Sequence, residues 1–179
     1  MRFRTALAAS LLALGSAGVP ATTTDWGVHP DFKAVLGTVV GSFTDYFDFE
    51  ITQAPAWLLS STVVANNLHI DGSHAFNIDF GNYEVYSVGG DLLPRTLDDT
   101  MLTGASYHFD GSTGNVTHSL QLVPGEYYYK VSGDANGSQG GLYLLTSAVN
   151  PIPEPETLAM YLAGLGVVGY LARRRQRSG

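Results

Sequence analysis

The sequence contains no cysteine, and it has very few basic residues outside its two ends. Without cysteine, the 179-residue chain forms no disulfide, offers no thiol nucleophile and builds no thiolate zinc site. Between residues 22 and 153, three basic side chains stand against 14 acidic ones, a net charge of −11; the three are Lys33, Arg95 and Lys130. A segment this acidic would repel phosphate, which argues against nucleic acid as a partner.

The first 21 residues have the composition of an export signal. Two arginines precede the apolar stretch 6–14, in which Ser10 is the only polar residue, and small residues follow. Residues 1–21 are therefore predicted to form the helix of a secretory signal peptide. Signal peptidase would cut after Ala21 or after Ala17. The alternative, an N-terminal helix of the folded domain, would require a polar face that this stretch lacks.

Residues 151–179 consist of three parts in a fixed order. The motif Pro153, Glu154 and Pro155 comes first, and a transmembrane helix is predicted over residues 157–172. A basic tail over 173–177 closes the chain, with Arg173, Arg174, Arg175 and Arg177. The 15 uncharged residues 158–172 would rise about 22 Å as a helix, against the ~30 Å of a bilayer core, so the anchor is marginal. The basic tail should remain in the cytoplasm, with the Pro-Glu-Pro motif outside.

This three-part segment resembles a PEP-CTERM sorting signal nearly position for position. The resemblance implies recognition by an exosortase, a membrane-embedded transpeptidase that cleaves near the Pro-Glu-Pro motif. The precursor would be held in the membrane for a time and then passed to the cell surface or the extracellular space. Such systems are associated with Gram-negative bacteria that make exopolysaccharide. The implied product is a surface or matrix protein linked to exopolysaccharide or biofilm.

Residues 22–150 have the pattern of an all-β domain. Pairs of Gly, Asn, Asp and Pro separate short runs that are rich in β-branched and aromatic residues. The predicted strands are 36–43, 45–52, 57–65, 75–80, 83–88, 100–109, 116–123, 126–132 and 141–148. Several runs alternate apolar and polar residues, among them Phe76, Ile78 and Phe80. We expect an antiparallel, jelly-roll-like β-sandwich of about 8–9 strands, between the signal helix and the transmembrane helix.

One predicted strand places a carboxylate in an apolar row. In an extended chain, Phe43, Asp45, Phe47, Phe49 and Ile51 share a face. Burying an unpaired carboxylate costs several kcal/mol, so Asp45 must accept hydrogen bonds, bind a cation or lie at a bulge. Backbone N–H groups of a neighbouring turn are the expected donors. A calcium ligand or a catalytic acid is the alternative.

The same segment resembles the signature of the FxDxF family of PEP-CTERM proteins. Phe43, Asp45 and Phe47 stand at its three defining positions, and residues 125–143 resemble the end of that family's domain. Residues 125–143 are also similar to the closing hairpin of bacterial prepeptidase C-terminal β-sandwich domains. The family resemblance implies no established activity and no catalytic residues.

The chemistry-bearing residues form no complete catalytic set. There is no Gly-x-Ser-x-Gly motif, so the protein is expected not to be an enzyme. An envelope hydrolase would have to bring Asp45 and His74 into one cleft. His69 and His74 flank an Asp-Gly turn, and they are interpreted as half-exposed side chains, with a metal site as the alternative.

The sequence predicts no cofactor, and Ca²⁺ is the alternative that its carboxylates offer. The candidate ligands are Asp45 and the carboxylates of one loop, Asp91, Asp98 and Asp99, although no EF-hand motif occurs. A solvated acidic loop is the competing interpretation.

Three consecutive tyrosines, 127–129, are expected not to be buried together, because neighbours on a strand point to opposite faces. Tyr128 is therefore predicted to point outward, where Trp26 or Trp57 could complete a sugar-stacking patch; an ordinary exposed tyrosine is the alternative. A carbohydrate- or calcium-dependent adhesion module is the second functional hypothesis.

Overall fold

The computed structural model describes residues 21–52 and 56–152, together with residues 160, 163 and 165. The described residues form 11 strands: β1 (Thr22–Val28), β2 (Phe32–Val39), β3 (Gly41–Ile51), β4 (Trp57–Ala65), β5 (Leu68–Ile70), β6 (Ser73–Phe76), β7 (Ile78–Ser87), β8 (Thr100–Phe109), β9 (His118–Leu122), β10 (Gly125–Ala135) and β11 (Gly141–Pro151). The Pro-Glu-Pro motif, the basic tail and all but single residues of the predicted signal peptide and anchor lie outside the described residues. Among the residues that are described, none belongs to a helix of the length and apolar character needed to cross a membrane.

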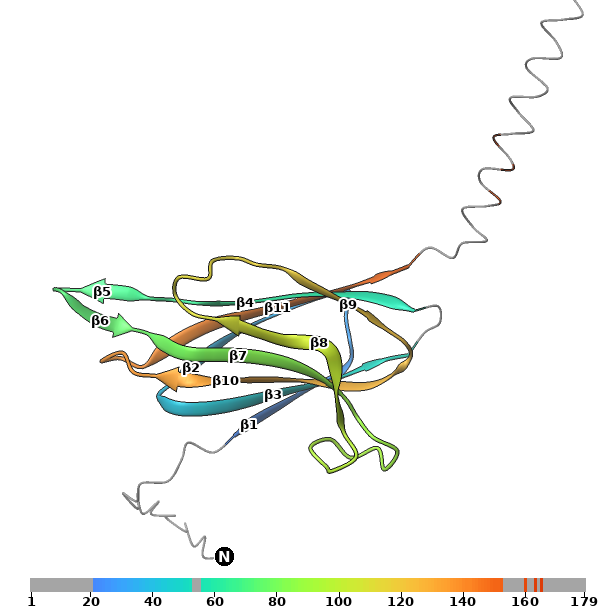
Figure 1. The fold of residues 1–179 in the computed structure, drawn as a ribbon, viewed down its shortest axis with the longest axis horizontal. Helices are drawn as coiled ribbons and strands as arrows, with labels where there is room; N and C mark the ends of the chain where they lie inside the picture. The colour runs from blue at the N-terminus through green and yellow to red at the C-terminus, as the bar shows by residue number, and fades with distance from the viewer. Residues whose placement is uncertain (1–20, 53–55, 153–159, 161–162, 164, 166–179) are drawn as a thin grey trace, which may run out of the picture.

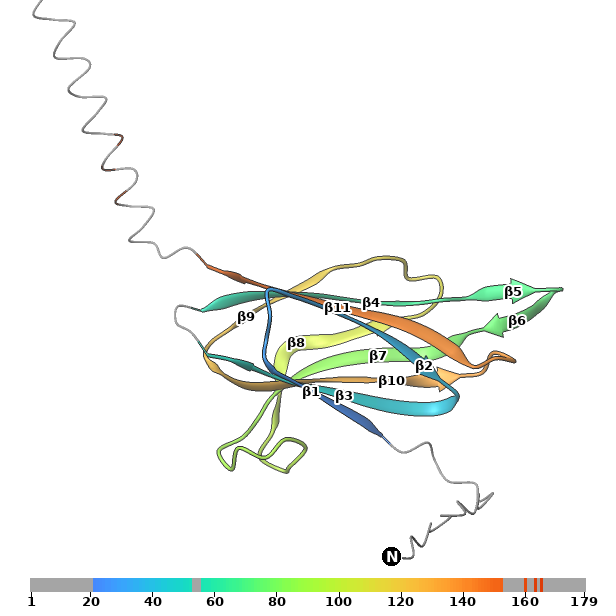
Figure 2. The same cartoon turned by 180° about the vertical axis from the view of Figure 1, so that it is seen from behind.

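Two sheets stack face to face, as Figures 1 and 2 show. One sheet has the order β1-β3-β10-β7-β8 and the other the order β2-β11-β4-β9, while β5 and β6 form a separate hairpin. The expected β-sandwich is thus confirmed. The pairing is antiparallel with one exception, because β1 runs parallel to β3. The expectation of a purely antiparallel sandwich is wrong at this edge.

The sequence pattern missed two strands, β1 and β5, and its predicted strand 75–80 runs across the end of β6 and the start of β7. Strand β1 is almost entirely exposed and pairs only with β3, so its sequence has no inward row of apolar residues. Strands β5 and β6 are three and four residues long, too short for a clear alternation. The count of about 8–9 strands was therefore too low.

The core is built on the inward faces of β3, β10 and β11. The row that the sequence predicted on β3 is buried, with Phe43, Phe47 and Phe49 at 3–4% exposure. The residues that are almost fully buried come from both sheets: Tyr83, Tyr129, Tyr143, Phe109, Leu59, Ile78, Leu122, Leu145, Val85, Val131 and Ser147. Burial of each large apolar side chain contributes about 1.5–3 kcal/mol, so this shared layer holds the sheets together.

Strand β7 departs from its predicted alternation at Phe80. Ile78 is fully buried, but Phe80 is 83% exposed and has a φ of 53°. The pairing of β7 with β10 shifts register between Ser132 and Asp134, which marks a bulge at this point. An extra residue in one strand turns the following side chains to the other face, and this explains the outward Phe80.

Candidate functional site at the open edge of the sandwich

The edge strands β1 and β2 line one cleft of about 410 Å³. Each of these strands has a partner on one side only, β3 for β1 and β11 for β2, so both edges are open. The cleft is lined by Thr22, Thr24, Val35, Leu36, Gly37, Thr38, Val39, Val40, Phe43, Asp45, Phe47 and Tyr143. All three residues of the FxDxF signature therefore lie where the core meets this cleft.

Asp45 forms a hydrogen bond to a residue of the opposite sheet. The Tyr143 hydroxyl on β11 donates to the Asp45 carboxylate on β3 at 2.5 Å, and the two residues are 1% and 9% exposed. Burial raises the pKa of Tyr143, and the hydrogen bond to Asp45 raises it further, so the phenol keeps its proton. The expectation that Asp45 accepts a hydrogen bond is confirmed, but the donor is a tyrosine and not a turn backbone. A turn donor would have been local, whereas Tyr143 is 98 residues away.

The position of Tyr143 depends on a glycine of the edge strand. Gly37 is the register partner of Tyr143 in the pairing of β2 with β11. A Cβ atom at Gly37 would lie 2.2 Å from Cε1 of the tyrosine ring. The ring therefore occupies the space above Gly37, which is a common reason for glycine inside a strand. On its other side, Phe43 stacks on Tyr143 with ring centroids 5.6 Å apart and an interplanar angle of 9°.

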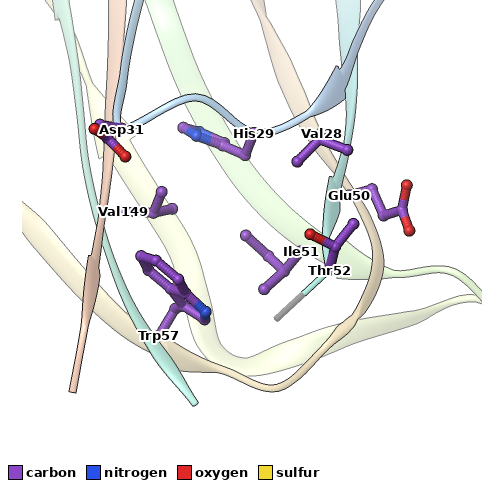
Figure 3. Close-up of a pocket in the computed structure, with 8 residues that line it drawn as sticks. All are labelled: Val28, His29, Asp31, Glu50, Ile51, Thr52, Trp57 and Val149. Atoms are coloured by element: carbon purple, nitrogen blue, oxygen red, sulfur yellow. The ribbon is translucent and has the colours of Figure 1, made fainter. Parts of the chain in front are cut away.

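A second pocket of about 220 Å³ lies where the chain passes from β1 to β2 (Figure 3). It is lined by Val28, His29, Asp31, Glu50, Ile51, Thr52, Trp57 and Val149. Figure 3 shows these side chains around a common hollow. His29 is 7% exposed, so its imidazole belongs to the core as well as to the pocket.

A chain of hydrogen bonds runs inward from His29. Nδ1 of the imidazole contacts the backbone oxygen of Pro30, which can only accept, so Nδ1 carries the proton. Nε2 therefore accepts from the Ser147 hydroxyl at 2.8 Å. The Ser147 oxygen in turn accepts from the Tyr129 hydroxyl at 2.7 Å. The network links β10 of one sheet to β11 of the other. The hydrogen bond between Tyr143 and Asp45 likewise crosses between the sheets, from β11 to β3.

The Ser147–His29 contact has the atoms of a nucleophile and its base, but a substrate could not reach it. Ser147 is 0% exposed. Burial lowers the pKa of His29 below its usual value, and Lys33 lowers it further, so the imidazole is neutral near pH 7. Sequence reasoning missed His29, Tyr129 and Ser147 as a group. The available signal was a serine among inward apolar residues of a strand, the same pattern that drew attention to Asp45.

Tyr128 is buried, contrary to the sequence-based expectation. It is 4% exposed, and Tyr127 and Tyr129 are buried on the opposite face. The connection from β7 to β8 covers it, with the Arg95 guanidinium 5.9 Å from its ring. Burial, and then the carboxylate of Asp99, raise the pKa of Tyr128. At residues 127–129 the strand is buried on both faces, so none of the three tyrosines points to solvent.

The predicted sugar-stacking patch is therefore wrong. Trp26 packs against Phe47 with ring centroids 5.5 Å apart, and Trp57 lines the pocket around His29. Neither tryptophan forms a surface with Tyr128. Arg95 also donates to Asp48 at 2.6 Å and lies 5.2 Å from the ring of Tyr46, which fixes the covering connection in place.

The structure separates Asp45 from the three loop carboxylates that were the other calcium candidates. Asp91, Asp98 and Asp99 lie in the connection between β7 and β8, whereas Asp45 is in the core of the sandwich. The loop carboxylates accept hydrogen bonds from their own loop; Asp99, for example, accepts from the backbone N–H of Gly89 at 2.9 Å. Within residues 21–52 and 56–152, no group of three or more His, Asp or Glu side chains is arranged to hold a metal ion.

Asp45 and His74 are likewise separate. Asp45 is bonded to Tyr143 inside the sandwich, while His74 is exposed on β6 and contacts His69 and Asn67. Asp45 and His74 therefore do not form the pair that the hydrolase hypothesis requires.

Comparison with known protein families matches residues 151–176 to the PEP-CTERM protein-sorting motif. No curated protein sequence matches the chain. Among solved structures, the pre-peptidase C-terminal domain of a collagenase from Bacillus anthracis is similar at 15% identity, with a TM-score of 0.43, over 75% of this chain and 100% of that one. PliG of Aeromonas hydrophila, a periplasmic inhibitor of g-type lysozyme, is similar at 11% identity and a TM-score of 0.42, over 73% of this chain and 99% of that one.

Proposed function

We propose, because residues 151–176 match the PEP-CTERM protein-sorting motif, that the mature form of this protein is a non-enzymatic component of the cell surface or extracellular matrix, associated with exopolysaccharide. The motif implies an exosortase as the processing partner. It also implies export, with a membrane-anchored precursor that is later delivered to the surface.

The observation that carries the proposal is the position of the motif relative to the last strand. The match begins at residue 151, and Pro151 is the last residue of β11, opposite Trp57. One further contact follows, from the Ile152 N–H to the Ala56 oxygen at 3.2 Å. Because β11 lies between β2 and β4, the four-stranded sheet depends on this strand. A cut near Pro153–Pro155 would release the complete sandwich.

The interior polar groups support a non-enzymatic role. Asp45 and Tyr143 pair across the sheets, and Ser147 joins His29 to Tyr129. Each of these groups is committed to a hydrogen bond that holds the sandwich together. Such buried networks fix one arrangement of a core, and these groups are thereby withdrawn from any substrate.

Mass spectrometry of the protein from its host tests the sorting step. With an active exosortase, the surface or medium fraction should contain a product that ends before Leu158. Deleting the exosortase gene, or the E154A/P155A substitution, should leave the precursor in the membrane fraction. The matched control is E126Q, which alters an exposed acid of β10 and should be processed normally. A surface product that still carries residues 158–177 in the active strain would contradict the proposal.

A second candidate is a carbohydrate-binding module, which the edge cleft favours. Thr22, Thr24 and Thr38 place exposed hydroxyl groups beside Leu36 and Val40, and sugar sites often combine such groups with apolar surface. Calorimetry with the host's own exopolysaccharide, with and without calcium, tests this candidate. L36D should abolish the heat of binding, whereas L97D, at a fully exposed loop position, should not. No heat in either condition would remove the candidate and leave the sorting proposal intact.

A further inference from the structure

We propose that the β5–β6 hairpin binds one divalent first-row transition-metal ion, with Zn²⁺ as the reference ion, through Nε2 of His69 and Nε2 of His74. The hairpin projects beyond the end of the two main sheets (Figures 1 and 2), so the site is separate from the edge cleft and from the pocket around His29. Neutral imidazole is a preferred ligand of zinc, copper and nickel ions.

The first support is the distance between the two nitrogen atoms. His69 and His74 are register partners across the hairpin, and their Nε2 atoms lie 3.2 Å apart. Two imidazole ligands at ~2.0–2.1 Å on a tetrahedral ion are about 3.3–3.4 Å apart, and ligands at a right angle about 2.9 Å. The observed separation falls between these values. In the structure this contact is a hydrogen bond, and the ring centroids lie 3.9 Å apart at an interplanar angle of 49°. To bind one ion, His69 gives up its Nε2 proton and the two rings turn apart until both lone pairs point at the ion.

The second support is the hydrogen bond that orients His74. Its Nδ1 lies 2.9 Å from Oδ1 of Asn67, an oxygen that can only accept, so Nδ1 carries the proton. The lone pair of His74 is then on Nε2, the atom that faces His69. A second partner that fixes the tautomer in this way is typical of histidines that bind metal. Asn67 itself packs closely on Gly111. A Cβ atom added at Gly111 would lie 2.1 Å from the Cβ atom of Asn67.

The third support is the turn that joins the two strands. Asp71 and Gly72 both have positive φ, 51° and 79°, which is the conformation of a two-residue type I′ hairpin turn. This turn fixes the register of β5 against β6 and so keeps the two histidines opposite each other. The two ligands are thus held opposite each other before an ion arrives, which reduces the entropic cost of binding.

The protein supplies two ligands, and the remaining coordination positions face solvent. His69 and His74 are both exposed, so water or a donor from another molecule can complete the coordination. The proposed site is therefore an open, exchangeable one and not a closed structural site.

Zinc titration of the full chain, purified without a histidine tag, tests the proposal by calorimetry and by imidazole ¹⁵N NMR. We expect one zinc ion per chain, with the Nε2 signals of His69 and His74 shifting together. H69A and H74A should each weaken binding at least about tenfold, and N67A by about 10–100-fold through loss of the orienting hydrogen bond. H108A removes an exposed histidine outside the hairpin and should bind zinc as the unaltered chain does.

Two results would overturn the proposal. The first is that H69A and H74A bind zinc as tightly as the unaltered chain does. The second is that the unaltered chain forms no one-to-one complex with zinc. Backbone amide signals of residues 68–76 show whether each variant keeps its hairpin. If H69A or H74A loses the hairpin, the zinc affinity of N67A tests the proposal instead. Asn67 lies outside both strands, and the N67A substitution keeps both histidine ligands.

Discussion

The Tyr143 hydroxyl lies 2.5 Å from the Asp45 carboxylate and joins two strands, β11 and β3, that belong to opposite sheets. Both residues are buried, and the contact lies beside an open edge cleft. Asp45 therefore serves the pairing of the two sheets. Its role is conformational: the hydrogen bond is satisfied only when the two sheets are aligned as they are here.

Removing the Tyr143 hydroxyl should destabilise the domain. Y143F leaves the buried carboxylate of Asp45 without this donor, which is expected to lower the free energy of unfolding by about 2–3 kcal/mol. Urea denaturation measures the loss. The double variant D45L/Y143F removes both polar partners and should be more stable than Y143F alone. A Y143F variant as stable as the unaltered chain would contradict the role assigned to this hydrogen bond.

Filling the space at Gly37 should displace the Tyr143 ring. In G37A the new Cβ would overlap the ring, and overpacking of this kind typically costs about 1–3 kcal/mol. Thermal unfolding measures the loss. The matched control is G90A, where nothing lies within 4 Å of an added Cβ, and its melting temperature should change little. Equal effects of G37A and G90A would show that the ring does not depend on this glycine.

The domain should lose stability at alkaline pH. Burial raises the pKa of Tyr83, Tyr129 and Tyr143, and in the folded state these phenols stay protonated above their usual pKa of about 10. The unfolded chain ionises there, so it binds fewer protons than the folded chain. Stability is thus complete below about pH 10 and falls above it, by up to about 1.4 kcal/mol per pH unit for each tyrosine.

Denaturation at pH 8–11.5, with tyrosinate absorbance recorded in parallel, checks this prediction. The absorbance of the buried tyrosines should rise only as the domain unfolds. Y143F should reduce the slope of stability against pH, because one of the phenols with a raised pKa is removed. Ionisation of all tyrosines at about pH 10 in a still-folded domain would contradict the prediction.

His29 should weaken the domain at acidic pH. Its folded-state pKa is lowered by burial and by Lys33, so the unfolded chain takes up its proton first, near pH 6.5. The stability from the neutral imidazole is complete above about pH 6.5 and is lost as the pH falls, by up to about 1.4 kcal/mol per pH unit. Protonation would also turn Nε2 into a donor and break its bond from Ser147.

The test for His29 compares the pH dependence of urea unfolding between H29Q and the unaltered chain. Carboxylates contribute to the acid response of both proteins, so the difference isolates His29. H29Q should be less stable at pH 7.5 and should lose less stability between pH 6.5 and 4.5. Parallel curves over this range would contradict a neutral, buried His29.

Features that depend on local pattern could be predicted from the sequence. The two-residue alternation of β3 fixed which side chains face inward, and all five predicted positions are buried there. The Pro-Glu-Pro motif followed by an apolar stretch and arginines is itself a local pattern, and it matched a family motif at residues 151–176. Strands without alternation, such as β1, were missed because their place in the sheet depends on a neighbour rather than on an apolar face of their own.

The sequence by itself determined that the domain is β-rich and acidic, that residues 151–176 carry a sorting motif, and that Asp45 must find a partner. Only the tertiary structure decided what that partner is, because Tyr143 is 98 residues away. It also decided that a loop covers Tyr128 and that Ser147 meets His29, which is 118 residues distant. Strand order in a sandwich sets such contacts, and that order follows from packing of the whole chain, which no local pattern contains.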